Sequence, residues 1–263
     1  MITPNTHSQS THLKLNTILT DGAKAERRGL AAWHLEIPGG PAGRYRLAQL
    51  DDYRNLPRTG FAWSPPLRLQ LLVRASHHQI PGTWGFGFWN DPFSLKLGFG
   101  SGRRIPALPN AAWFFFASPP NYLSLRDDLP TNGCLAATFS STTIPAIWLA
   151  LAGLAVPLLA VPPLARTLRR IARRFVRQGS SSFSVDTMEW HSYGLAWEFD
   201  RARYSLDGQV LLETPIVPGG PLGLVIWVDN QYLAFPPDGR FHSGTLENPD
   251  PVWIEVEQLS IER

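Results

Sequence analysis

The segment LRLQLLVRA, which runs from Leu67 to Ala75, alternates apolar and polar side chains. Side chains of a strand point to opposite faces in turn, so a period of two indicates a strand. One face of this segment is apolar and consists of Leu67, Leu69, Leu71 and Val73. We therefore expect a strand with one face in a hydrophobic core and the other face partly exposed.

Similar short segments, separated by turn residues, lie on both sides of this strand. They include AWHLEI (Ala32–Ile37), TWGFGFW (Thr83–Trp89), AAWFFFAS (Ala111–Ser118), CLAATFSS (Cys134–Ser141) and VWIEVEQLSI (Val252–Ile261). The chain also has 24 Pro and 22 Gly, a composition rich in turns. Many short strands with helix confined to one insert are typical of a β-sandwich. The sequence therefore predicts an all-β fold.

The chain of 263 residues is long enough for one large β domain. Residues 1–22 are mostly polar, and we expect a flexible N-terminal tail there. Residues 23–263 are expected to form a single sandwich domain with an insertion at residues 144–179. The single cysteine, Cys134, excludes an internal disulfide and a cysteine metal cluster.

The insertion has an apolar half and a basic half. IPAIWLALAGLAVPLLAVPPLA (Ile144–Ala165) carries no charge, whereas RTLRRIARRFVRQ (Arg166–Gln178) contains six arginines. An uncharged run of this length could cross a bilayer core of about 30 Å. A single crossing would place the earlier and later strands on opposite sides of the membrane, where they could not pair. We therefore expect a structure that does not span.

Four prolines interrupt the insertion, and they predict two short helices instead of one long one. These prolines are Pro145, Pro157, Pro162 and Pro163. The expected helices run over Ala146–Val156 and from about Pro163 to Gln178. The second helix is amphipathic, so the pair is expected to enter one leaflet while its arginines meet lipid phosphates. Alternatively, the helical pair covers the sandwich or forms a homodimer contact.

The predicted membrane-binding residues combine the apolar tip with the basic helix. They are Trp148, Leu151, Leu154, Leu158, Leu159, Arg166, Arg169, Arg170, Arg173, Arg174 and Arg177. Six of the 24 Lys+Arg residues lie in this helix, which leaves 18 basic residues against 21 acidic ones elsewhere. Such local basicity favours an anionic membrane surface over nucleic acid as the partner. Because Met1–Gly22 shows no basic segment followed by an apolar one, we expect a cytoplasmic protein, peripheral on the inner membrane face.

The segment WHSYGLAWEFDRARYSLDGQVLLET (Trp190–Thr214) resembles the family 16 glycoside hydrolases, the laminarinase- and lichenase-like enzymes. The resemblance is carried by Trp190, His191, Tyr193, Leu195, Trp197, Tyr204, Asp207 and Gly208. It implies a concanavalin A-like jelly-roll β-sandwich, here with one inserted α-helical hairpin. Many relatives of this fold hold a structural calcium, but no acidic loop of this sequence argues for one. We expect no cofactor.

The catalytic motif of that family, E-x-D-x-E, is missing. The corresponding strand, Ala111–Ser118, contains neither Asp nor Glu, and Trp and Phe stand in their place. A retaining glycosidase needs two carboxylates, so the usual family reaction is disfavoured. An aromatic cleft suits an apolar ligand or a stacked sugar ring instead. We therefore expect a glycolipid or another lipid-borne, amphiphilic molecule as the ligand.

The predicted ligand-binding residues are aromatic and polar side chains of the central strands. They are Trp84, Phe86, Phe88, Asn90, Trp113, Phe115, Tyr122, Trp227 and Gln231. For the aromatic ones, the alternative is that they fill the space between two sheets. No metal site is predicted.

Two aspartates are candidate catalytic residues if the protein is an enzyme. Asp229 lies in the apolar segment IWVDNQY, where a carboxylate is costly unless it is paired or functional. Asp91 precedes a proline at the end of a strand. Either could serve as acid or base on a hydrophobic substrate, in a cyclase, isomerase or hydrolase reaction. A further alternative is a glycan hydrolase with displaced catalytic acids.

Overall fold

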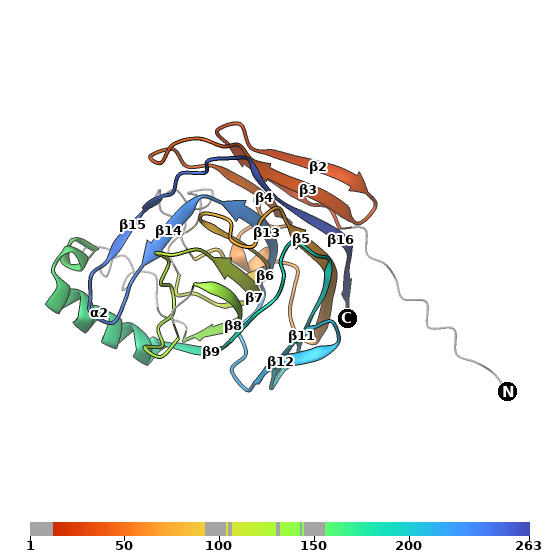
Figure 1. The fold of residues 1–263 in the computed structure, drawn as a ribbon. Coiled ribbons are helices and arrows are strands. Elements are labelled where there is room, and N and C mark those ends of the chain that lie inside the picture. The colour runs from red at the N-terminus through yellow and green to blue at the C-terminus, as the bar shows by residue number, and fades with distance from the viewer. Residues whose placement is uncertain (1–12, 93–103, 105–106, 130–131, 143, 145–155) are drawn as a thin grey trace.

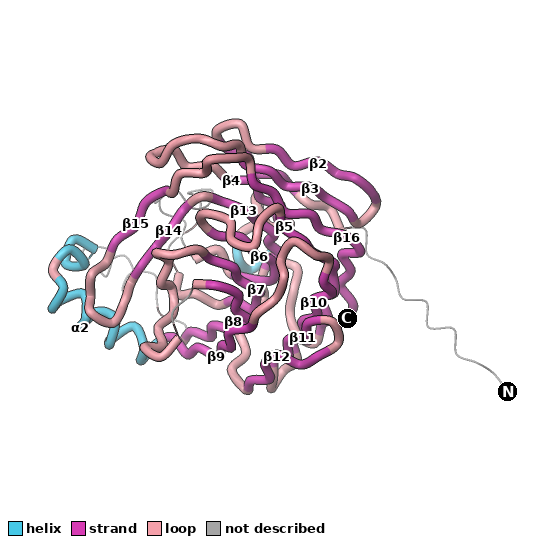
Figure 2. Tube along the Cα trace, viewed as in Figure 1, coloured by secondary structure: helices cyan, strands magenta, loops and turns pink. Residues whose placement is uncertain are grey.

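The computed structural model describes residues 13–92, 104, 107–129, 132–142, 144 and 156–263. In this part of the chain, two antiparallel sheets of seven strands each form the body of the molecule (Figure 1). Figure 2 shows strands throughout both layers and the helix α2 at one end. This architecture confirms the predicted all-β jelly-roll sandwich.

The first sheet carries the candidate site. Its strands, in spatial order, are β1 (Asn16–Thr20), β4 (Leu47–Asp51), β13 (Gly223–Asp229), β6 (Thr83–Trp89), β7 (Ala111–Ala117), β8 (Gly133–Ser141) and β9 (Val176–Phe183). The second sheet closes the other side of the core. Its strands are β12 (Gln209–Thr214), β11 (Ala202–Leu206), β10 (His191–Trp197), β5 (Leu67–Ala75), β16 (Val252–Glu262), β3 (Ala32–Ile37) and β2 (Lys24–Gly29). A separate hairpin pairs β14 (Gln231–Ala234) with β15 (His242–Thr245).

The hydrophobic core lies between the two sheets. The apolar face of β5 is buried there, and Arg68 and Gln70 on its other face are exposed, as the alternation predicts. From the first sheet, Phe86 meets Phe114 at a ring-centroid distance of 5.4 Å and Tyr193 of the second sheet at 5.1 Å. The core is therefore built largely of interlocking aromatic rings.

Trp84, Phe86 and Phe88 belong to this core, so the prediction that they line a cleft is wrong. They are 4%, 0% and 0% exposed and pack against the second sheet. Alternation along β6 leaves Thr83, Gly85, Gly87 and Trp89 for the outer face of the first sheet.

The glycines of β6 make room for rings from the neighbouring strands. A Cβ atom added at Gly85 would lie 2.7 Å from Cη2 of Trp227, and one added at Gly87 would lie 2.7 Å from Cβ of Trp113. Side chains on β6 would occupy the space that these two tryptophans use. The alternating glycines therefore let an aromatic layer lie directly over the strand.

The ends of the predicted tail and insertion differ from the structure. Asn16–Thr20 pairs with β4, so this part of the predicted tail is a strand; residues 1–12 lie outside the described residues. The helix α2 spans Pro162–Phe175, and β9 begins at Val176, because the chain there pairs with β8. The insertion thus ends before residue 179.

The first predicted helix of the insertion falls on residues 145–155, outside the described residues, together with Trp148, Leu151 and Leu154. The residues that follow, Val156–Ala160, form a 3₁₀ turn. None of the helices that the structure describes is long and apolar enough to cross a membrane.

Candidate functional site

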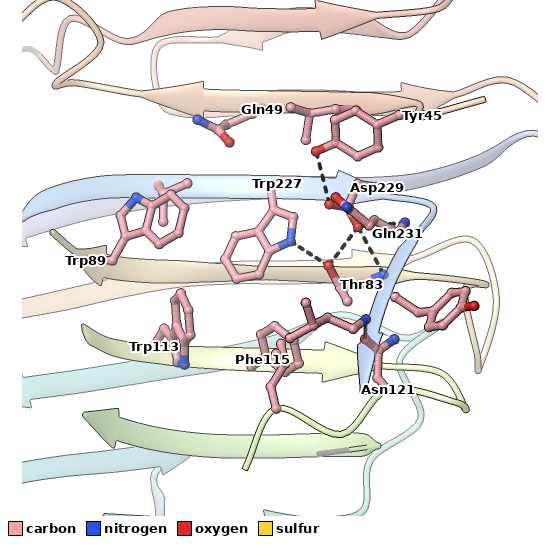
Figure 3. Close-up of a pocket in the computed structure, with 15 residues that line it drawn as sticks. Tyr45, Gln49, Thr83, Trp89, Trp113, Phe115, Asn121, Trp227, Asp229 and Gln231 are labelled. Atoms are coloured by element: carbon pink, nitrogen blue, oxygen red, sulfur yellow. Dashed lines mark hydrogen bonds between the residues drawn. The ribbon is translucent and has the colours of Figure 1, made fainter. Parts of the chain in front are cut away.

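A cavity of about 110 Å³ opens on the outer face of the first sheet, away from the core (Figure 3). Its walls come from β4 and the chain just before it, from β13, β6 and β7, from the chain after β7, and from β14. The lining residues are Tyr45, Leu47, Gln49, Thr83, Trp89, Trp113, Phe115, Asn121, Leu123, Val225, Trp227, Asp229, Gln231, Tyr232 and Leu233. The surface of this cavity is mainly apolar.

Aromatic rings from three adjacent strands form one wall of the cavity. Trp113 lies 5.5 Å from Trp227 and 5.6 Å from Phe115, measured between ring centroids. Trp89 lies 5.8 Å from Trp113 and extends the row. These tilted contacts hold the rings at fixed angles to one another. The wall can therefore receive a flat or rounded apolar group.

The opposite end of the cavity is polar and is centred on Asp229. Its Oδ1 atom accepts hydrogen bonds from the Thr83 hydroxyl (2.8 Å), the Thr83 amide (3.3 Å) and the Gln231 amide (3.3 Å). Its Oδ2 atom accepts a hydrogen bond from the Tyr45 hydroxyl at 3.3 Å. The indole N–H of Trp227 donates to the Thr83 hydroxyl at 3.0 Å, which links the polar end to the aromatic wall (Figure 3).

Burial determines the protonation of the Asp229 carboxyl. Asp229 is 3% exposed, and removal from water raises its pKa to about 7, although hydrogen bonds from Thr83, Gln231 and Tyr45 act in the opposite direction. Burial and the neighbouring Asp229 charge raise the pKa of Tyr45 well above its ordinary value, so its hydroxyl keeps its proton. Asp229 therefore changes charge near neutral pH.

Five of the predicted site residues meet in this cavity. They are Trp113, Phe115, Trp227, Asp229 and Gln231. Asn90 does not belong to the described walls: its amide donates to the carbonyl of Leu108, and its oxygen accepts from the amide of Asn110. Tyr122 also lies outside them, because its ring packs under the guanidinium of Arg169 at 5.4 Å.

Asp91 is not a cavity residue either. It is 2% exposed, and its carboxylate forms an ion pair with the buried guanidinium of Arg104. The carbonyl oxygen of Asp91 accepts a hydrogen bond from Arg58 at 2.6 Å. Its backbone has a φ of 46°, the turn conformation that Asp tolerates. The structure thus places Asp91 in an ion pair outside the described walls of the cavity, and it gives no support to a catalytic role for Asp91 there.

Several cavity residues were missed by sequence reasoning. Thr83 and Trp89 had a usable signal, since they share the outer face of β6 with the two glycines. Tyr45, Gln49 and Asn121 had none, because they approach the cavity from segments far away in the sequence.

The described walls hold one carboxylate, Asp229, and so they do not supply the pair that a retaining or inverting glycosidase uses. The described residues also contain no group of three His, Cys, Asp or Glu side chains that fits a calcium or another metal ion.

The helix α2 lies next to the chain segments that border the cavity. It is anchored by Arg169, which is 3% exposed and donates to the carbonyl oxygens of Ser124 (2.7 Å) and Phe235 (2.6 Å). Arg169 also forms an ion pair with Asp127 at 3.0 Å, and Arg173 pairs with the same carboxylate. The prediction that Arg169 contacts a membrane is therefore wrong; it attaches the helix to the sandwich.

Three large apolar side chains of α2 are exposed. Leu164, Ile171 and Phe175 are 42%, 44% and 39% exposed, and they follow one another at helical spacing on one face. Leu158 and Val161, just before the helix, are also exposed. The arginines that remain exposed are Arg166, Arg170, Arg173, Arg174 and Arg177. We call Leu164, Ile171 and Phe175 the apolar stripe of α2.

No protein-family model and no curated protein sequence matches the chain. Solved structures do resemble it. The β-glucanase of Bacillus licheniformis is 8% identical, with a TM-score of 0.46 over 97% of this chain and 92% of the enzyme. A Bacteroides ovatus family 16 glycoside hydrolase, solved with a product of mixed-linkage glucan, is 8% identical with a TM-score of 0.45 over 92% of each chain.

LamAcat from Zobellia galactanivorans is 12% identical, with a TM-score of 0.43 over 88% of this chain and 77% of its own. At such identities and scores, the similarity concerns the sandwich and carries no information on the ligand. The solved structures similar to this chain thus include family 16 glycoside hydrolases, the family that Trp190–Thr214 resembles.

Proposed function

We propose that this protein binds an apolar or amphiphilic molecule, one group of which is buried in the aromatic cavity, and that it does so at an anionic membrane surface. The cavity supports the first part of this proposal. Rings from three strands line it on the outer face of the first sheet, a face that a sandwich would otherwise expose to water. Moving an apolar group from water into an apolar hollow of this kind lowers the free energy.

The volume of the cavity limits what it receives. At about 110 Å³ it is somewhat smaller than an engineered cavity of about 150 Å³ that binds benzene, and it is far smaller than pockets of about 300–1,000 Å³ that enclose whole drug-sized ligands. One ring or one short branched group therefore fits inside. The remainder of a larger ligand would extend through the mouth of the cavity, as expected for a glycolipid or another amphiphile.

Replacing Phe115 with Ala is expected to weaken binding of octyl glucoside about tenfold, because one ring of the cavity wall is lost. Isothermal titration calorimetry below the micellar concentration of the detergent measures this change. Phe199→Ala is the matched control, since Phe199 is 73% exposed, and it should leave the affinity unchanged. Equal affinities for wild type and both variants would contradict the assignment of the cavity. Mass spectrometry of the natively purified protein identifies any ligand retained from the cell.

The surface of α2 supports the membrane part of the proposal. An apolar stripe that faces water is unfavourable, and lipid acyl chains would cover it. The exposed arginines of the same helix would meet anionic headgroups, each at about 1 kcal/mol near such a surface. An anionic lipid surface is therefore favoured as the partner that covers the apolar stripe. A second copy of this chain is disfavoured, because its arginines would repel those of the first copy.

The double variant Leu164→Glu, Ile171→Glu is expected to lose co-sedimentation with vesicles that contain phosphatidylserine, because carboxylates resist burial among acyl chains. Val210→Glu is the matched control; Val210 is 56% exposed on β12, and this variant should sediment like wild type. Binding by the double variant equal to that of wild type overturns the proposal. Self-association without lipid, seen by analytical ultracentrifugation and lost in the double variant, would instead assign the stripe to a homodimer.

A further inference from the structure

Asp229 is a buried carboxyl that has no cationic partner among the described residues, and it lines the cavity. Asp91, which is buried to a similar degree, has its ion pair with Arg104. Asp51 is also buried without an ion pair, but it lies outside the cavity walls, and amide groups of Asn16, Gln49, Tyr53 and Arg54 satisfy it. Asp229 is therefore the buried carboxyl that a ligand can reach.

A buried carboxylate is stable only when it is paired or when it takes up a proton. Oδ1 of Asp229 is saturated by three donors, whereas the hydrogen bond from Tyr45 to Oδ2 is long, at 3.3 Å. The described walls contain neither Lys nor Arg. The site thus retains an uncompensated negative charge whenever the carboxyl is ionised.

The aromatic wall beside this carboxyl attracts positive charge as well. The face of an indole or phenyl ring is electronegative, and a cation within about 6 Å of the ring centroid is stabilised by it, most strongly over Trp. Trp227 shares the outer face of β13 with Asp229, and its ring lies 5.5 Å from that of Trp113 and 5.8 Å from that of Phe115. Aromatic rings beside a carboxylate are groups that suit the binding of an organic ammonium ion.

We infer that the group buried in the cavity is the ammonium head of an amphiphile, held between the aromatic wall and the Asp229 carboxylate. This inference rests on the proposed function, because it names the ligand class of the same cavity. A neutral apolar group would use the rings but leave the carboxylate uncompensated. The cavity volume of about 110 Å³ suits a compact, branched head such as trimethylammonium better than a fused ring system.

Choline and 3,3-dimethylbutan-1-ol are a matched pair of probes, because they have the same shape and differ in the charge of one central atom. At pH 8, where Asp229 is mostly ionised, choline is expected to bind at least about tenfold more tightly than its neutral isostere. Titrations followed by tryptophan fluorescence and by calorimetry measure both affinities. Asp229→Asn should reduce the preference for choline several-fold, to what the aromatic rings alone provide, and should affect the neutral probe much less than choline. Asp200→Asn, a change at an exposed carboxylate, should retain the preference.

The outcomes separate this inference from the proposed function. Equal binding of the two probes overturns the ammonium inference and leaves an apolar-ligand site. If neither probe binds, both the ammonium inference and the proposed binding of an apolar group of this size are wrong. A preference for choline that is as large in Asp229→Asn as in wild type removes Asp229 from the recognition. Circular dichroism should give the same spectrum for Asp229→Asn and wild type, so that a reduced preference for choline is not due to a loss of folding.

Discussion

Asp229→Asn is expected to make the protein more stable than wild type at pH 8 and to flatten the pH dependence of its unfolding. The pKa of Asp229 is raised from 3.8 to about 7 in the folded protein, mainly by burial. Between these two values the folded state binds more protons than the unfolded state, so stability falls as the pH rises through this range. Ionisation of Asp229 therefore costs on the order of 4 kcal/mol above pH 7.

The asparagine variant keeps the local hydrogen bonds while removing the charge. Its side-chain oxygen can accept the bonds from Thr83 and Gln231, and its NH₂ group can donate to the Tyr45 hydroxyl. Urea unfolding at pH 5 and pH 8 measures the effect: wild type should lose stability between the two values, and the variant should lose much less. Asp200→Asn is the control and should follow wild type. A pH profile of Asp229→Asn parallel to that of wild type would show that Asp229 does not titrate in this range.

Arg169→Met is expected to detach α2 and to destabilise the protein by about 3 kcal/mol, because it removes two hydrogen bonds that a charged donor makes at the edge of the sandwich. The acceptors are the carbonyl oxygens of Ser124, which is buried, and of Phe235, which is partly buried. The ion pair with Asp127 adds little, since that carboxylate is 48% exposed and is screened by water. Met retains the apolar stem of the side chain, so the loss reports on the guanidinium.

Hydrogen exchange of the α2 amides and urea unfolding test this expectation. Arg170→Met is the matched control, because Arg170 lies on the same helix but is exposed. It should leave both measurements near those of wild type. Arg169→Lys should fall between the two, since an ammonium cannot make the forked contacts of a guanidinium. Equal protection of α2 in Arg169→Met and Arg170→Met would show that Arg169 does not anchor the helix.

Alternation along single strands predicted part of the site. Trp113 and Phe115 share one face of β7, and Trp227 and Asp229 share one face of β13, as alternation requires of residues two positions apart. Alternation cannot say which face of a strand meets the second sheet, and for β6 the wrong face was chosen. The glycines were the better guide, because an outer face made of glycine must receive side chains from its neighbours.

The remaining site residues depend on pairing between distant segments. Thr83 reaches Asp229 only because β6 and β13 are neighbours, although 146 positions separate the two residues in the chain. Likewise, the sequence offers a single local signal that distinguishes Arg169 from the other arginines of α2. Ala165 shares its face, and such a small side chain allows a helix to approach a sheet closely.

Arg169 also joins two borders of the cavity. The carbonyl of Ser124 ends the segment that contributes Asn121 and Leu123 to the wall, and the carbonyl of Phe235 follows the Tyr232–Leu233 pair of β14. Any displacement of α2 that keeps these two hydrogen bonds would therefore move both borders together. If the proposed vesicle binding displaces α2, thermodynamic linkage requires reciprocity: vesicles would change the affinity for a cavity ligand by the same factor by which that ligand changes the affinity for vesicles.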